Sequence, residues 1–230
     1  MMISPESYYE LELKGKSAEE LRREIDELKK EIGDLKYKME DPDYRPEWVS
    51  PSDDTVLYWT REYLAMAKKA LLEAGGEYID TEEDRRAAAF LEKLPYMTKL
   101  EFSYGGFGPY EPIIIECDSE SLKWNVERPV PLMPYDSPLR TRTELLKRIR
   151  ELHLEEWESD YWPDKYGITV LDGIQWELTL EYGNGLEPWK SFGSNAYPFN
   201  FREFLEMLGE DYRFFDEDPE DDEYGEDGEE

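Results

Sequence analysis

The residue types that most often carry out catalysis are scarce in this chain. It has one histidine, His153, and one cysteine, Cys117. A cysteine nucleophile needs a base within hydrogen-bonding reach, and the sequence gives no geometry that brings these two residues together. His153 follows Leu152 on a predicted basic helix, which is typical of a surface or boundary residue, and Cys117 is in phase with Ile113 and Ile115 on a predicted strand, which is typical of a small core residue. We predict no catalytic residue and expect the protein not to be an enzyme.

Phosphate and metal sites need patterns that the chain lacks. The stretch Gly105-Gly106-Phe107-Gly108 has no lysine after it and does not join a strand to a helix, as a phosphate-binding loop would. A single histidine excludes any site that needs two, and the acidic residues 216–230 lack the spaced ligands and turn glycine of a calcium loop. Acidic residues are also too numerous for any pair of them to indicate a carboxylate-based hydrolase. We predict no metal site and no cofactor.

Charge is the most unusual property of the sequence. The chain has 27 basic against 57 acidic residues, and its formal net charge is −30. Residues 216–230 contain eleven acidic residues and no basic one, which leaves −19 for the rest of the chain. Such a surface repels nucleic acid and anionic membranes and attracts basic proteins. We predict a basic protein partner, no direct contact with nucleic acid and no membrane association.

The expected compartment is the cytoplasm. One cysteine allows no intramolecular disulfide, which favours a reducing environment. The first residues lack the basic and apolar regions of a secretion signal, and nowhere do eighteen apolar residues follow one another.

The first part of the chain has the apolar spacing of long helices. Ser17 and Glu20 form a capping box, and apolar residues then recur every three or four positions as far as Glu40. They are Leu21, Ile25, Leu28, Ile32, Leu35 and Met39. A second helix, Asp54–Ala74, can pack on this seam as an antiparallel hairpin, or the seam can form a coiled coil with another chain. We favour the hairpin, because three heptads are short for an independent coiled coil; the oligomeric state stays open.

The hydrophobic period then changes from helical to strand-like. After a helix at Glu82–Leu94, we predict strands at Lys99–Tyr104, Pro112–Cys117 and Ser121–Glu127 and then a helix opened by a capping box at Thr141 and Glu144. A hairpin follows, which joins Ile168–Leu171 to Ile174–Glu181, and a turn at Gly183-Asn184-Gly185 leads to a further strand over Leu186–Phe192. The last element is a helix capped by Asn200 and Glu203. The fold class is α+β, with an antiparallel helical hairpin followed by an antiparallel sheet covered by helices. We expect a helical region over residues 1–95, a sheet domain over 96–215 and a disordered acidic tail over 216–230.

Aromatic residues crowd the C-terminal half of the chain and allow two interpretations. They can fill the core between sheet and helices, because aromatic side chains bury large areas. They can also form an exposed recognition surface like the hot spots of protein interfaces. The candidate interaction residues under this second interpretation are Trp157, Tyr161, Trp162, Trp189 and Tyr197.

One basic cluster stands out in this acidic chain. Its members lie on and just before the predicted helix that starts near Thr141, and they are Arg140, Arg142, Lys147, Arg148 and Arg150. The simpler interpretation is charge balance against an acidic neighbouring surface. The alternative is an anion or phosphate contact through Arg142, Arg148 and Arg150, which the surrounding negative potential opposes.

Several short motifs in a fixed order resemble those of a family of uncharacterised proteins from Firmicutes, many of them clostridial. The matching stretches are Gly105-Gly106-Phe107, Trp157 with Tyr161, Leu171-Asp172-Gly173 with Trp176, and Asn195-Ala196-Tyr197-Pro198, together with residues 14–19, 39–44, 60–64 and 74–76. The resemblance covers nearly the whole chain apart from the acidic tail, and it implies no activity.

Two functional hypotheses follow from these observations. The first is a non-catalytic acidic protein that binds a basic partner, in one form an inhibitor that occupies a nucleic-acid-binding cleft by mimicking nucleic acid. The second is a small-molecule or peptide-binding domain that uses the Trp- and Tyr-rich C-terminal part, with the charge serving solubility alone.

Overall fold

The computed structural model describes residues 2–45, 50–106, 112–126, 139–170 and 173–210. The predicted acidic tail, residues 216–230, lies outside the described residues. The chain folds into two compact units. Of the described residues, the helical unit comprises 2–45, 50–89, 162–169 and 196–199, and the sheet unit comprises 90–106, 112–126, 139–161, 170, 173–195 and 200–210. The first boundary lies inside a helix, and the chain returns twice to the helical unit.

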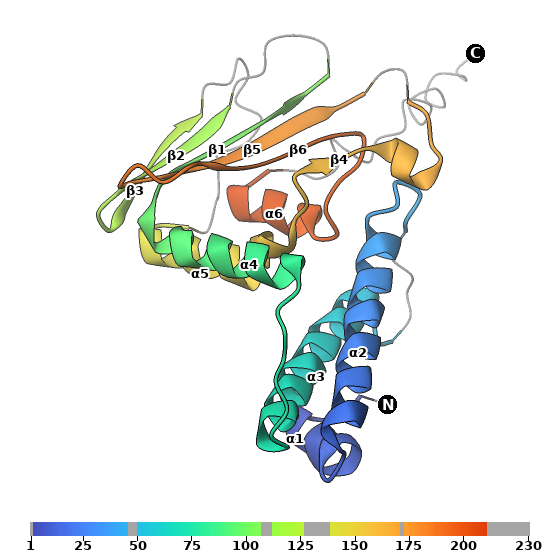
Figure 1. The fold of residues 1–230 in the computed structure, drawn as a ribbon. Helices are drawn as coiled ribbons and strands as arrows, with labels where there is room; N and C mark the ends of the chain where they lie inside the picture. The colour runs from blue at the N-terminus through green and yellow to red at the C-terminus, as the bar shows by residue number, and fades with distance from the viewer. Residues whose placement is uncertain (1, 46–49, 107–111, 127–138, 171–172, 211–230) are drawn as a thin grey trace, which may run out of the picture. The chain divides into compact units, whose positions relative to one another are not determined.

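The helical unit is built on two long helices that lie side by side (Figure 1). Its elements are α1 (Pro5–Tyr8), a π-helical turn (Tyr9–Leu13), α2 (Ala18–Met39), α3 (Asp53–Glu73) and the first part of α4 (Glu82–Lys93). Ser17 caps α2 in the predicted capping box with Glu20. No helix of the described ranges has the length and apolarity needed to cross a membrane.

The apolar seam of α2 packs against α3 of the same chain, so the predicted helical hairpin is confirmed. One core cluster joins the buried residues of α2 and α3 to the first turns, and its members are Tyr8, Leu13, Leu21, Ile25, Leu28, Ala67, Ala70 and Leu71. Small alanines on α3 let the two helices approach closely, while leucine and isoleucine on α2 fill the space between them. Burial of this seam stabilises both helices far more than their intrinsic propensities do.

The sheet unit contains six strands in the order β3-β2-β1-β5-β6-β4. Their bounds are β1 (Met97–Gly105), β2 (Ile113–Asp118), β3 (Ser121–Val126), β4 (Asp160–Tyr161), β5 (Gln175–Tyr182) and β6 (Trp189–Ser194). The two-residue strand β4 pairs parallel to β6, and every other neighbouring pair is antiparallel. With helices α5 (Arg142–Glu151) and α6 (Phe201–Leu208) on one face of this sheet (Figure 1), the predicted α+β class is confirmed.

Strict alternation of side chains gives the sheet one apolar face. Leu100 and Phe102 of β1 are fully buried, as are Leu178 and Leu180 of β5. The register pairs Leu100 with Leu180 and Phe102 with Leu178, so these residues form one continuous apolar layer at the centre of the sheet. The residues between them in each strand point to the opposite face, because side chains alternate along a strand.

Aromatic rings fill the space between this layer and α6. The ring of Phe204 lies 5.1 Å from that of Phe102 and 5.1 Å from that of Trp157, both edge-on. The ring of Trp176 lies 5.0 Å from that of Phe201. Edge-to-face packing of this kind adds about 0.5–1.5 kcal/mol per pair to the gain from burial. The core interpretation of the aromatic residues therefore holds for this group.

The predicted strand at Ile168–Leu171 is not a strand. A short 3-10 helix, Pro163–Tyr166, ends at Gly167, and residues 168–170 have no regular structure, while Leu171 lies outside the described residues. The reason is that both edges of β5 are occupied, one by β1 and the other by β6. The predicted turn is present inside the loop between β5 and β6, with Asn184 at φ 63° and Gly185 at φ 71°, the positive values that a type I′ turn requires.

Asn200 does not cap the last helix as predicted. Its side chain makes no capping hydrogen bond. Instead, its Oδ1 accepts a hydrogen bond of 2.8 Å from the indole Nε1 of Trp157, and its Nδ2 donates to the carbonyl oxygen of Leu152. The buried amide therefore ties the start of α6 to the segment that follows α5, because a buried indole N–H and a buried carbonyl both need a partner.

Replacing Asn200 by alanine is expected to lower the free energy of unfolding by about 2–3 kcal/mol, because it leaves the buried Trp157 N–H and the Leu152 carbonyl without their partners. Urea unfolding followed by tryptophan fluorescence measures this change. Asn125→Ala, at an exposed position of β3, is the matched control and should stay within about 0.5 kcal/mol of the unsubstituted protein. Equal effects of the two substitutions would contradict the role given to Asn200.

Candidate functional site

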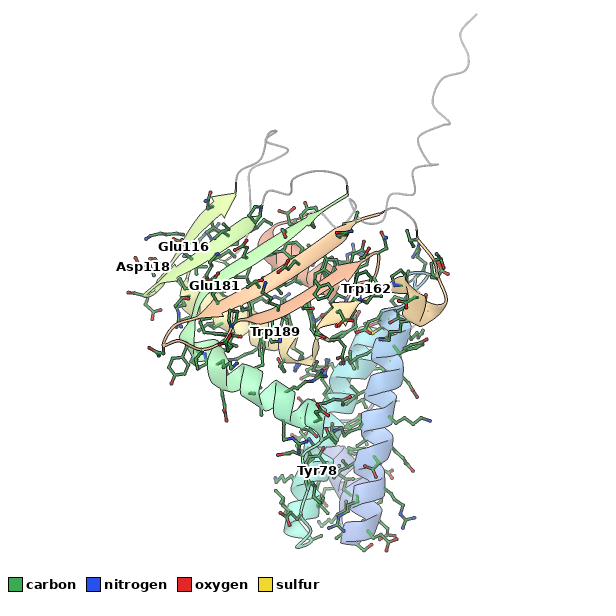
Figure 2. All side chains as sticks on the ribbon, turned by 45° about the horizontal axis from the view of Figure 1, so that its top comes forward. Tyr78, Glu116, Asp118, Trp162, Glu181 and Trp189 are labelled. Atoms are coloured by element: carbon green, nitrogen blue, oxygen red, sulfur yellow. The ribbon has the colours of Figure 1, made fainter. Side chains whose placement is uncertain are left out.

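The face of the sheet opposite α5 and α6 is polar, and no described helix covers it. We call it the open face. Its charged residues come from all six strands, and they are Lys99, Glu101, Glu116, Asp118, Lys123, Asp160, Glu177, Glu181 and Lys190. Carboxylates therefore outnumber lysines by six to three. Figure 2 shows Glu116, Asp118 and Glu181 on the strands of this sheet.

A shallow depression of about 230 Å³ lies on the open face. We call it the acidic hollow, and it is lined by Glu101, Ser103, Glu177, Thr179, Glu181, Pro188 and Lys190. Its position follows from the register, which pairs Glu101 with Thr179 and Ser103 with Glu177 across β1 and β5. The side chains of Ser103 and Thr179 are shorter than those of the glutamates around them, so the surface is depressed at these two positions.

Lysines neutralise part of the charge around the acidic hollow. Lys99 Nζ lies 2.6 Å from Glu101 Oε2 and 3.0 Å from Glu181 Oε1. Lys190 Nζ lies 2.9 Å from Glu177 Oε1. Lys99 donates hydrogen bonds to Glu101 and Glu181. These bonds, the one to Glu101 most of all, raise the pKa of the Lys99 ammonium group, and they outweigh burial, which lowers it. Lys99 therefore stays charged, and three glutamates share two lysines.

This arrangement suits the binding of cationic groups. The lining contains three carboxylates, two hydroxyls and one ammonium group, and neither a histidine nor a cysteine. Carboxylates that already stand in a fixed array accept hydrogen bonds from a guanidinium or ammonium group at little cost in side-chain freedom. The acidic hollow can therefore receive a cationic side chain, and the neighbouring exposed ring of Phe192, 41% exposed on β6, can contact its apolar stem.

The five candidate aromatic residues do not form one surface. Trp157 and Tyr161 are each only 3% exposed and belong to the core of the sheet unit, so neither can contact a partner. Trp189 is half-buried and packs edge-on against Phe90, 5.1 Å away, in the same unit. Trp162, 46% exposed, and the half-buried Tyr197 belong to the helical unit. Exposure thus leaves Trp162 as the strongest candidate of the five.

The predicted basic cluster is largely engaged within the protein. The guanidinium of Arg142 donates hydrogen bonds to the carbonyl oxygens of Pro95 and Met97, at the start of β1. Arg148 Nη1 lies 3.5 Å from Glu151 Oε2. Arg150 is exposed at the end of α5. These contacts support charge balance over an anion site for Arg142 and Arg148.

The two residues with catalytic potential lie apart in the fold. Cys117 is half-buried on β2, where burial raises the pKa of its thiol and Arg142 lowers it less. A thiol of this kind is mostly protonated at neutral pH and is a poor nucleophile. His153 follows α5, next to Glu155 and Glu156. Among the described residues, nothing pairs the thiol with the imidazole.

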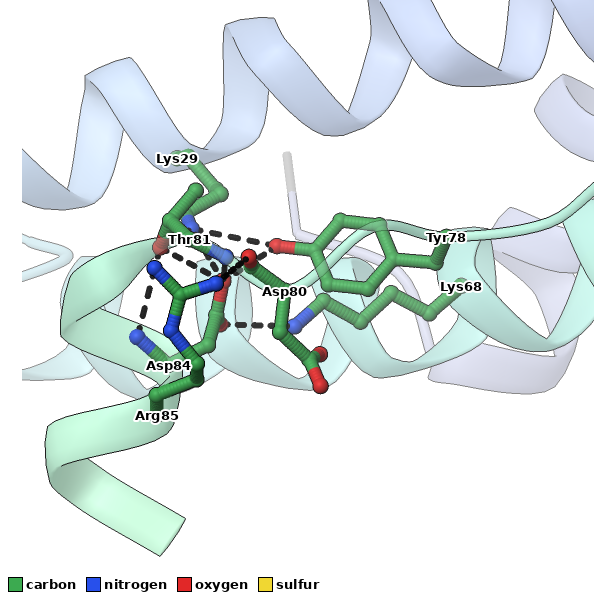
Figure 3. Close-up of polar contacts among 7 residues, drawn as sticks. All are labelled: Lys29, Lys68, Tyr78, Asp80, Thr81, Asp84 and Arg85. Atoms are coloured by element: carbon green, nitrogen blue, oxygen red, sulfur yellow. Dashed lines mark hydrogen bonds and ion pairs between the residues drawn. The ribbon is translucent and has the colours of Figure 1, made fainter.

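A second concentration of polar groups surrounds Asp84 in the helical unit (Figure 3). Lys29 Nζ lies 2.8 Å from Asp84 Oδ2, and Lys68 Nζ lies 3.1 Å from Asp84 Oδ1. The hydroxyls of Tyr78 and Thr81 also donate to Oδ2, at 2.6 and 2.7 Å. One carboxylate therefore joins α2, α3 and the N-terminus of α4. The four side chains that contact this carboxylate all belong to the helical unit, which indicates a structural role.

Comparison of the chain with models of protein families, with curated proteins and with solved structures finds no match. Membership in the clostridial family stays a prediction. The function is therefore inferred from the geometry and charge of this chain alone.

The Asp84 network should make stability depend on pH in a defined direction. Burial raises the pKa of the Asp84 carboxyl, but the hydrogen bonds from Lys29, Tyr78 and Thr81 outweigh it and hold that pKa well below the ordinary value of 3.8. A carboxyl with a depressed pKa in the folded state stabilises the fold above its unfolded pKa, and this contribution is lost as the pH falls toward the folded value.

Asp84→Asn is accordingly expected to lower the free energy of unfolding by about 2 kcal/mol at pH 7, and the deficit should narrow between about pH 5 and pH 2. Urea unfolding at a series of pH values measures it. Asp80→Asn, which removes a neighbouring exposed carboxylate, is the control. A deficit for Asp84→Asn that stays constant down to about pH 2 would contradict this account of the network.

Proposed function

We propose that the protein is a non-catalytic binding protein whose open face engages a basic protein partner. The observation that carries this proposal is the acidic hollow, in which Glu101, Glu177 and Glu181 converge on a space of about 230 Å³. The surrounding charge supports it, because a chain with a net charge of −30 attracts cationic proteins over a long range. Long-range attraction would bring the partner in, and the acidic hollow would fix one of its arginine or lysine side chains.

The size of the acidic hollow favours a side chain of a partner over a free ligand. Small-molecule sites usually occupy about 300–1,000 Å³ and are mostly apolar. The acidic hollow is smaller than that range and is lined mainly by polar groups. A flat polar sheet face with one shallow charged depression resembles the part of an interface that sets partner specificity and the rate of association.

One form of this function is inhibition of a nucleic-acid-binding protein. A basic cleft that binds phosphates also attracts an array of carboxylates, so the protein would occupy the cleft as a mimic of nucleic acid. The proposal in this form requires duplex DNA or RNA to compete with the protein for the same partner. It keeps the protein in the cytoplasm, as expected for a chain with a single cysteine.

The alternative, a small-molecule or peptide-binding domain that uses the aromatic residues, has weaker support. Two of its five candidate residues, Trp157 and Tyr161, are buried. Among these five candidates, Trp162 alone offers a large exposed indole surface, which is little for a ligand that must bury most of its area.

Replacing Glu177 and Glu181 together by glutamine should weaken binding of an octa-arginine peptide by about tenfold, or about 1.4 kcal/mol. The substitutions remove two negative charges from the acidic hollow and leave the Lys190 ammonium group, which loses its ion pair with Glu177, to repel the peptide. Isothermal titration calorimetry at low salt and at about 0.15 M salt measures the affinities, which should fall with salt for every variant.

The control is Glu27→Gln with Glu31→Gln, which removes the same charge from exposed positions of α2. This variant should bind octa-arginine almost as tightly as the unsubstituted protein. An equal loss of affinity in both double variants would show that net charge alone drives binding, and the proposal for the open face would then fail.

A further inference from the structure

The only histidine of the chain lies beside two carboxylates at the end of α5. His153 Nδ1 is 3.0 Å from Glu155 Oε1 and 3.8 Å from Glu156 Oε1. One ligand atom from each of the three side chains lies within 4.8 Å of the other two. The three residues lie within positions 153–156 of the sheet unit, and none of them lines the acidic hollow.

One carboxylate oxygen in this group lacks a hydrogen-bond partner. The side chain of Glu155 is only 10% exposed, and its Oε2 is buried with no donor among the described residues. A buried oxygen of an ionised carboxyl without a partner is strongly destabilising, because it has lost its water and gained nothing in return. An ion pair between His153 and Oε1 leaves Oε2 unsatisfied. A cation bound at the group would satisfy the carboxylate.

One pair of donor atoms has the spacing of two neighbouring ligands of a small divalent ion. Nitrogen and oxygen ligands lie about 2.0–2.2 Å from such an ion, so two neighbouring ligands are about 3.0 Å apart in an octahedral site and about 3.4 Å apart in a tetrahedral one. The 3.0 Å between His153 Nδ1 and Glu155 Oε1 fits the first value. The 3.8 Å from His153 Nδ1 to Glu156 Oε1 is longer than either value, so the Glu156 side chain has to move closer when an ion binds.

The backbone that carries these three side chains is well anchored. α5 ends at Glu151, and His153 takes up the left-handed conformation, with φ 52° and ψ 46°, that turns the chain into the 3-10 helix Leu154–Glu156. The N–H groups of Glu156 and Trp157 donate to the carbonyl oxygens of His153 and Leu154, at 2.9 and 3.1 Å. Leu152, Leu154 and Trp157 are buried on the other side of this turn. A ligand set on such an anchored turn needs little reorganisation to bind an ion.

We propose that His153, Glu155 and Glu156 form a binding site for a divalent first-row transition-metal ion. Imidazole with carboxylates is the ligand set of ions such as Zn²⁺, Mn²⁺ and Fe²⁺, whereas Mg²⁺ and Ca²⁺ prefer oxygen alone. Three protein ligands leave at least one coordination position for water or for a group of a partner. The prediction of no metal site excluded sites with two histidines and did not consider one histidine with two nearby carboxylates.

A single histidine makes the proposal directly testable. The full chain is labelled with ¹⁵N, and the two ring nitrogens of His153 are followed by NMR while ZnCl₂ is added at pH 7. Binding at the site should shift the Nδ1 resonance in a saturable way at one equivalent and leave a proton on Nε2. Zinc that binds only to other carboxylates of this acidic chain would leave the His153 resonances unchanged, and this outcome would overturn the proposal.

Two variants separate the site from general affinity for cations. Glu155→Gln should weaken the zinc-dependent shift of Nδ1 by about tenfold or more, since it removes one ligand. Glu151→Gln removes an exposed carboxylate of α5 that pairs with Lys147 and Arg148, and it should leave the titration unchanged. Equal titrations for Glu155→Gln and the unsubstituted protein would contradict the ligand set.

A third variant guards against loss of the fold. Glycine adopts the left-handed conformation of residue 153 without strain, so His153→Gly should keep the fold. The thermal midpoint of the unsubstituted protein should rise on addition of Zn²⁺, because the ion binds the native state alone, and that of His153→Gly should rise much less. Equal rises in the two proteins would count against the site.

Discussion

The pairing of β1 with β5 is the interaction on which the sheet unit depends. Side chains alternate along β5 and, after an irregularity between Met97 and Lys99, along β1, and the register places Leu100 opposite Leu180 and Phe102 opposite Leu178 on the apolar face. The same register brings Glu101, Ser103, Glu177 and Thr179 together on the open face. A slip of one residue would turn carboxylates into the core and leucines into water, so burial of the apolar layer fixes the acidic hollow as well.

Charge in this protein is organised at short range despite its large excess. Lysines do not spread evenly over the surface. Lys99 contacts two glutamates of the open face, while Lys29 and Lys68 converge on Asp84 in the helical unit. Each lysine that is held in this way relieves repulsion between neighbouring carboxylates, and the carboxylates left over carry the net charge of −30. A basic partner would form ion pairs with these remaining carboxylates.

Local patterns in the sequence predict most of the elements. The capping boxes at Ser17 and Thr141 mark helix starts correctly, because the cap needs only residues three positions apart. The seam of α2 and the alternation of β5 predict which faces are buried. Tertiary context decides the rest: Ile168–Val170 has the composition of a strand, but β5 has no free edge for it.

The candidate sites were harder to predict because they depend on juxtaposition. Asn200 has a typical capping sequence, yet its side chain bonds the distant Trp157. The acidic hollow joins residues of β1 and β5 that are more than seventy positions apart, and only the order of the strands brings them together. His153, Glu155 and Glu156 lie close together in the sequence. The observations that make them a candidate metal site are the left-handed turn at His153 and the burial of Glu155.

The central claim, that the open face receives cationic groups, is tested most directly by mapping backbone amide resonances of the full chain during titration with octa-arginine. The account predicts saturable shifts concentrated on β1, β5 and β6 around Glu101, Glu177 and Glu181. Shifts spread evenly over the exposed carboxylates of α2 and the sheet, or an unresponsive open face, would contradict it.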